Sequence, residues 1–167
     1  NTKKEPVNLL NKLKLNPANS PVPPFGGDDH FDISPNGEYV SFTYSLREDE
    51  AVNTVWINKL VHIVNDEYEV IKEFEESGIE GRKQNPLFVN DSLLSYTAMP
   101  RKYLESDYTY LVFYDIQAKQ TRHLTKKFTY SIASFTIFNE DKNKLSSETS
   151  VGKYLSFNNP PSSYNDK

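Results

Sequence analysis

The chain has 167 residues, a net charge of −4 and no cysteine. Its lysines and arginines are scattered, which excludes the basic surface of a nucleic-acid-binding protein, and no apolar run reaches the roughly 18–20 residues of a membrane span. The absence of cysteine excludes disulfide scaffolds, thiol catalysis and cysteine-based zinc sites. The length fits one domain of about 100–200 residues, and 11 Tyr with 10 Phe favour strands.

Residues 1–27 form a Pro-rich N-terminal segment. Its prolines at 17, 21, 23 and 24 deny backbone donors to a regular ladder, and a short helix is predicted before them, at Val7–Leu15. The chain starts without Met and without the apolar stretch of a secretory signal, so we expect a processed or truncated product.

Residues 28–80 read as one four-stranded unit. Alternating apolar residues on both sides of Pro35-Asn36-Gly37 predict a hairpin, because Asn and Gly accept the backbone angles of tight turns. The four predicted strands are Phe31–Ser34, Tyr39–Tyr44, Thr54–Leu60 and Tyr68–Phe74. Four consecutive antiparallel strands are typical of one blade of a β-propeller.

The same order recurs over residues 81–130. A turn at Asn90-Asp91-Ser92 separates the first two of four predicted strands, which are Pro86–Val89, Leu93–Met99, Tyr110–Ile116 and Thr121–Thr125. If Leu60 and Ile116 close matching strands, the repeat interval is 56 residues, slightly longer than the roughly 40–50 residues of familiar propeller repeats.

Residues 131–167 are expected to hold the start of a third blade followed by loop. Phe135–Phe138 reads as its first strand, Leu145 as the beginning of its second, and Ser146–Lys167 as loop. The predicted fold class is therefore all-β, a partial β-propeller of about two four-stranded antiparallel blades and the start of a third. Because two blades cannot close a ring, we expect a longer native molecule.

An ordered series of motifs resembles the dipeptidyl-peptidase V and acylaminoacyl-peptidase branch of the prolyl oligopeptidase serine peptidases. The series covers about residues 20–145 and comprises Ser20–Gly27, Phe31–Gly37, Asn85–Phe88, Tyr96–Met99, Tyr103–Asp107, Tyr114–Ile116 and His123–Thr125. The second turn departs from the pattern, since Asn90-Asp91-Ser92 replaces the usual Ser-Pro-Asp-Gly.

The resemblance implies a two-domain serine exopeptidase that acts on peptide N-termini without a cofactor. Its propeller would restrict substrate entry, and an α/β-hydrolase domain outside this segment would carry Ser, Asp and His. The six glycines never form Gly-x-Ser-x-Gly, so no catalytic triad is expected within these residues. The expected partners are peptide substrates and that hydrolase domain, and a homodimer is left open. A non-catalytic propeller that binds proteins or peptides is the alternative.

Glu105 and Asp107 are the candidate substrate-binding residues. They lie on the loop between the second and third strands of the second unit, and an aminopeptidase recognises the substrate's α-ammonium with carboxylates. The competing interpretation is a solvated loop or an ion pair with Arg101 or Lys102.

Other polar residues have simpler interpretations. Asp28-Asp29-His30 offers metal-ligand types, but neighbours on an extended chain point apart, so no metal site is expected. His62 and His123 read as structural histidines without a nearby nucleophile. Asn90 meets the acceptor pattern for N-glycosylation, which matters if the protein is secreted or periplasmic, as the family suggests, rather than cytoplasmic.

Overall fold

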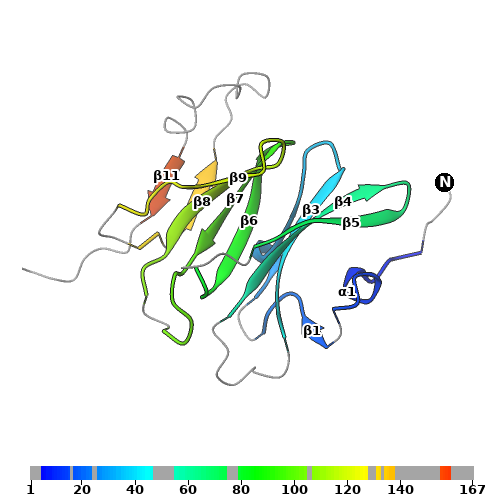
Figure 1. Cartoon of the computed structure of the whole chain (residues 1–167), viewed down its shortest axis with the longest axis horizontal. Coiled ribbons are helices and arrows are strands. Elements are labelled where there is room, and N and C mark those ends of the chain that lie inside the picture. The colour runs from blue at the N-terminus through cyan, green and yellow to red at the C-terminus, as the bar shows by residue number, and fades with distance from the viewer. Residues whose placement is uncertain are drawn as a thin grey trace, which may run out of the picture.

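A computed structural model shows a chain that is almost entirely β-structure. The structure describes residues 5–15, 17–23, 26–46, 55–74, 79–104, 107–127, 131–132, 134–137 and 155–158. Within them, three sheets follow one another in chain order (Figure 1). The all-β fold class is confirmed, and two successive antiparallel sheets of four and five strands are the arrangement expected of a partial propeller.

The first sheet is built on a central strand, β3. Its order is β1-β3-β4-β5, and β2 pairs with β3 beside β1; the strands are β1 (Ala18–Asn19), β2 (Phe31–Ile33), β3 (Tyr39–Leu46), β4 (Ile57–Val64) and β5 (Glu67–Glu73). The predicted hairpin at Pro35-Asn36-Gly37 is confirmed, with Gly37 at φ +75° and its N–H bonded to the Ser34 carbonyl at 2.8 Å. β4 and β5 turn at Asn65-Asp66, both of which have positive φ, as two-residue hairpin turns require.

The second sheet is a simple meander in the order β6-β7-β8-β9. Its strands are β6 (Lys83–Asn90), β7 (Leu93–Ala98), β8 (Tyr110–Asp115) and β9 (Gln120–His123). Asn90 closes the first turn, because its Oδ1 accepts the Ser92 N–H at 2.9 Å. All four strands predicted from the sequence are therefore present, and each neighbouring pair is antiparallel.

The interval between the two units is shorter than the 56 residues read from the sequence. Leu60 does not close its strand: it lies within β4 opposite Ser41, whereas the equivalent serine of β7, Ser95, lies opposite Phe113. Leu60 therefore corresponds to Phe113, 53 residues later, and Ser41 to Ser95, 54 residues later. The sequence interpretation was wrong because β4 continues to Val64: it pairs with β3 as far as His62 and with β5 as far as Val64.

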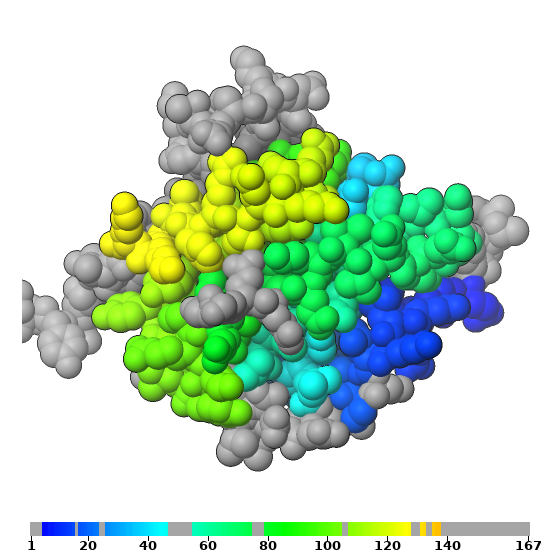
Figure 2. All heavy atoms as spheres, viewed as in Figure 1, coloured from blue at the N-terminus to red at the C-terminus, as the bar shows by residue number. Residues whose placement is uncertain are grey.

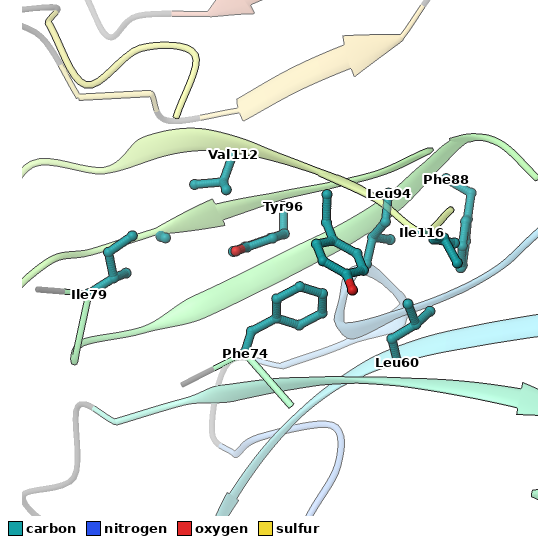
Figure 3. Packing of buried hydrophobic residues seen from close by; sticks show 10 residues of the cluster. Leu60, Phe74, Ile79, Phe88, Leu94, Tyr96, Val112 and Ile116 are labelled. Atoms are coloured by element: carbon teal, nitrogen blue, oxygen red, sulfur yellow. The ribbon is translucent and has the colours of Figure 1, made fainter. Parts of the chain in front are cut away.

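The first two sheets pack face to face through one apolar cluster. Leu60, Phe74 and Ile79 contribute from the first unit and the link after it, and the second sheet contributes Phe88, Leu94, Tyr96, Ala98, Val112, Tyr114 and Ile116. Figure 3 shows Phe74 and Leu60 directed towards the strands that carry Tyr96 and Leu94. Leu60, Phe74 and Leu94 have no exposed surface, so this contact excludes water.

The outer faces of the two sheets are covered by different elements. Leucines at 9, 10, 13 and 15, on and beside α1 (Leu9–Lys12), pack on the far face of the first sheet, and Figure 2 shows this N-terminal segment, in blue, lying against that sheet. The helix is shorter than the predicted Val7–Leu15, since Asn8 caps its start and Lys14 has φ +56°.

The far face of the second sheet carries Val89, Leu111 and Phe113, which pack with Ile132 and the strand β10 (Ser134–Ile137). β10 confirms the predicted opening strand of a third hairpin. Its partner is β11 (Leu155–Asn158), whereas Leu145 lies outside the described residues. The prediction of loop throughout Ser146–Lys167 was therefore wrong at 155–158, where apolar and polar residues alternate as in a strand.

Candidate functional site

Asp107 is the most constrained carboxylate of the loop between β7 and β8. The Arg101 side chain donates two hydrogen bonds to it, Nε to Oδ2 at 3.0 Å and Nη2 to Oδ1 at 2.7 Å. The backbone N–H groups of Arg101 and Tyr108 donate two more, at 3.1 and 2.9 Å. Asp107 is 5% exposed, and these four bonds occupy the acceptor positions of its carboxylate.

Charge-assisted bonding sets the protonation of this pair. The hydrogen bond from Arg101 holds the pKa of Asp107 below its ordinary value, and it outweighs burial, which acts in the opposite direction. The same contact raises the pKa of Arg101. The ion pair with Arg101, the competing interpretation from the sequence, is present. Asp107 holds the loop in shape, and direct contact between Asp107 and a substrate stays a prediction.

The loop rests against the link between the two sheets. The N–H groups of Glu80 and Gly81 donate to the carbonyls of Pro100 and Met99 at 2.7 and 3.1 Å. A Cβ at Gly81 would lie 2.6 Å from the Arg101 carbonyl oxygen, so only glycine allows this approach. Of the residues described in this loop, Tyr103 and Tyr108 are 63% and 51% exposed. Glu105, the other predicted substrate-binding residue, lies outside the described residues.

Two aspartates join the first two sheets, and no sequence pattern predicts either role. Asp32 on β2 accepts the Phe88 N–H of β6 at 2.7 Å, and Asp91 accepts the Asn36 N–H at 2.8 Å. Each bond links positions 55 or 56 residues apart. Only the stacking of the two sheets brings these groups together.

Asp28, Asp29 and His30 form a single 3₁₀ turn, η1 (Asp28–His30). His30 is 2% exposed, and its Nδ1 accepts the Val22 N–H at 3.2 Å. Asp29 instead accepts the Gly27 N–H. Within the part of the chain that the structure describes, no three acidic or histidine side chains gather as metal ligands would.

The remaining candidate residues lie in separate places. His62 is on β4 and stacks on Tyr39, with ring centroids 4.6 Å apart, and His123 is on β9 opposite Val112. Asn90 is half-buried in the β6–β7 turn, where its Oδ1 accepts from Ser92; its glycosylation stays a prediction. Of the helices among the described residues, none has the length and apolar character needed to cross a membrane.

Comparison with known proteins gives relatives that share one description. A probable dipeptidyl-peptidase 5 of Aspergillus niger is 30% identical over 149 residues, 85% of this chain and 20% of that protein. The similarly described protein of Aspergillus clavatus is 33% identical over 111 residues, 62% of this chain and 15% of its own length. The dipeptidyl-peptidase 5 of Arthroderma otae is 36% identical over 107 residues, 60% of this chain and 14% of its own length.

No protein-family model and no solved structure match the chain. The chain spans a fifth or less of the length of these curated relatives. The resemblance to the dipeptidyl-peptidase V branch is confirmed, and over most of its length this chain is related in sequence to one segment of the dipeptidyl-peptidase 5 proteins.

Proposed function

We propose that this chain forms consecutive blades of a β-propeller in a serine exopeptidase that removes dipeptides from peptide N-termini. The observation that carries the proposal is the similarity to dipeptidyl-peptidase 5 proteins over up to 85% of the chain. On this proposal the nucleophilic Ser, its His and its Asp belong to an α/β-hydrolase domain outside these residues, and the reaction is acyl transfer through a serine ester.

The packing of the sheets supports a role in restricting access. The two sheets are joined by a dry apolar face and by the bonds of Asp32 and Asp91, and together they make a wall. A wall beside an active site admits short or flexible peptides and keeps bulk protein and excess water away from the reacting ester. The propeller thus selects substrates by size and takes no part in bond breaking.

The β7–β8 loop is the proposed substrate-facing element. Because Asp107 already accepts four hydrogen bonds, we assign it to positioning the loop. Glu105, two residues away, is the carboxylate proposed to bind the α-ammonium of the substrate by a charge-assisted hydrogen bond. Loss of that bond weakens substrate binding and leaves the chemistry intact.

The activity is tested with the full-length protein, a fluorophosphonate probe and a chromogenic dipeptidyl substrate. We expect probe labelling of one serine outside these 167 residues and release of dipeptides from free N-termini. A folded preparation that is neither labelled by the probe nor able to cleave the substrate would contradict the peptidase and favour a non-catalytic binding propeller. Labelling within these residues would contradict the placement of the catalytic centre.

The loop assignment is tested with Glu105→Gln, and Glu67→Gln serves as the control because Glu67 is exposed on β5, in the other sheet. We expect KM for the dipeptidyl substrate to rise about tenfold or more in the first variant, the loss of roughly 1.5–3 kcal/mol for a hydrogen bond to a charged group, with kcat retained. Equal KM values in both variants would refute the role of Glu105.

Secretion is proposed from the family resemblance, and glycosylation at Asn90 depends on it; a homodimer is a separate proposal. Expression in a fungal host, with mass analysis before and after glycosidase treatment, tests the first two. Asn90→Gln should remove one glycan mass, and an unglycosylated secreted protein would contradict the modification. Light scattering of the purified protein determines the oligomeric state.

A further inference from the structure

His30 is the one histidine among the described residues that is almost completely buried. It lies under the Pro-rich N-terminal segment, where Val22 is 3% exposed. The Val22 N–H donates to His30 Nδ1 at 3.2 Å, so in this state Nδ1 is an unprotonated acceptor and the proton of the neutral ring resides on Nε2.

His30 is closely packed by its surroundings. Its ring meets Trp56 edge-on, with centroids 5.1 Å apart, and a Cβ at Gly26 would lie 2.6 Å from Nδ1. Gly26 in turn donates its N–H to the Val22 carbonyl at 2.8 Å. Val22 and Gly26 therefore both lie close against the imidazole.

The segment held by this contact also completes the first sheet. Ala18 and Asn19 of β1 pair with Leu46 and Ser45 of β3, and Ser20 Oγ donates to the Thr43 carbonyl at 2.7 Å. Residues 18–20 thus belong to the sheet, and a release of this segment would uncover the same edge of β3.

We propose that His30 and the Val22 N–H form an acid-sensitive contact that fastens residues 17–23 to the first sheet and releases them when the imidazole is protonated. A protonated Nδ1 cannot accept the Val22 N–H, and it would direct a second N–H against it. The proposal concerns a conformational device in these blades and does not depend on the proposed peptidase activity.

Charged groups on the surrounding elements do not reverse this effect. The charged residues on these elements are Asp28 and Asp29 on η1, Asp32 on β2, and Arg82 and Lys83 at the start of β6. Arg82 stacks on Trp56 at 4.5 Å, Lys83 Nζ donates to the Gly81 carbonyl, and Asp32 accepts from Phe88. Burial lowers the pKa of His30, and Asp29 opposes this more weakly.

The direction of the pH dependence follows from the lowered pKa. A histidine that is neutral when folded and titrates near 6.5 when released contributes its full stabilisation above that value. The contribution falls as the pH drops below 6.5 and is exhausted below the pKa of the closed form. Each unit of lowering corresponds to a tenfold change in the closing equilibrium.

Hydrogen exchange followed by mass spectrometry on the full-length protein tests the contact. After correction for intrinsic exchange rates, protection of peptides covering residues 17–23 should fall about threefold or more between pH 7.5 and 5, a range we choose to span the ordinary histidine value. Protection of β7 and β8 should stay constant over this range. Equal protection of residues 17–23 at both pH values would overturn the proposal.

Two variants separate His30 from general acid effects. His30→Asn keeps an oxygen acceptor that does not titrate and should make the protection independent of pH, whereas His62→Asn should keep the wild-type dependence. A wild-type dependence in His30→Asn would refute the role of His30. If that variant does not fold, ¹⁵N NMR titration of wild-type histidines decides, because a His30 midpoint at or above 6.5, or a proton on Nδ1, contradicts the contact.

Discussion

Phe74 offers the sharpest test of how the two sheets are held together. It follows β5, has no exposed surface, and lies against Tyr96 and Tyr114 with ring centroids 4.8 and 5.1 Å away. Phe74→Ala removes the ring from the centre of the contact between the sheets. A buried Phe→Ala change costs about 3–5 kcal/mol, and two aromatic pairs, each worth about 0.5–1.5 kcal/mol, place the expected loss near 4–5 kcal/mol.

Phe31→Ala is the matched control, since the same side chain is 48% exposed on the outer face of the first sheet. Half of a Phe side chain's transfer free energy, without a closed cavity, corresponds to about 1 kcal/mol. Urea unfolding of the full-length protein, read by intrinsic fluorescence and by exchange of the β3–β8 peptides, gives both values. Similar losses in the two variants would refute the reasoning that this face is the principal contact.

A double-mutant cycle identifies the aromatic part of that loss. Phe74→Leu keeps an apolar side chain and should lower the free energy of unfolding by only about 1–1.5 kcal/mol. It therefore replaces the alanine variant if that variant does not fold. Combined with Tyr114→Leu, the coupling free energy should be about 0.5–1.5 kcal/mol. Strict additivity would show that the T-shaped pair contributes no more than its buried area.

Three further variants test the contacts that position the loops. Gly81→Ala should destabilise by about 1–3 kcal/mol, because the new Cβ meets backbone oxygens at 2.6 and 2.8 Å, whereas Gly27→Ala, with its nearest contact at 3.6 Å, should stay within about 0.5 kcal/mol; equal urea midpoints would contradict this. Asp32→Ala should cost about 1.5–3 kcal/mol by leaving the Phe88 N–H without its charged acceptor, against a negligible change for Asp28→Ala. Since the folded pKa of Asp107 is lowered, its stabilisation is present above the ordinary value of 3.8 and is lost as the pH falls through the folded pKa; Asp107→Asn should lack this part of the acid destabilisation, and identical acid profiles would exclude it.

The hairpins were predictable because their information is local. Alternation on either side of Pro35-Asn36-Gly37 and of Asn90-Asp91-Ser92 fixes two turns and four strands, and the structure has all of them. The third hairpin was half predicted, since β10 follows the same rule, while β11 lies in a stretch whose Ser, Asn and Pro content resembles loop.

Features that depend on sheet stacking were not predictable from local pattern. β1 is only two residues long and lies between two prolines, so its strand character comes from pairing with Ser45 and Leu46. The bonds of Asp32 and Asp91 join residues in different units, so nothing near either aspartate in sequence indicates its partner. In contrast, the pairing of Asp107 with Arg101 spans six residues and was among the alternatives that the sequence left open.

The polar groups of the described residues are engaged chiefly in holding the sheets and loops in place. Asp32 and Asp91 bond across the two sheets, Asp107 fixes the β7–β8 loop, and Glu73 pairs with the buried Lys59 and with the Tyr44 hydroxyl. Each of these contacts serves the structure, and Asp107 has all four acceptor positions of its carboxylate occupied. If the proposed peptidase is correct, substitutions at these positions will therefore alter which peptides reach the catalytic serine, so that KM and size selectivity change before kcat does.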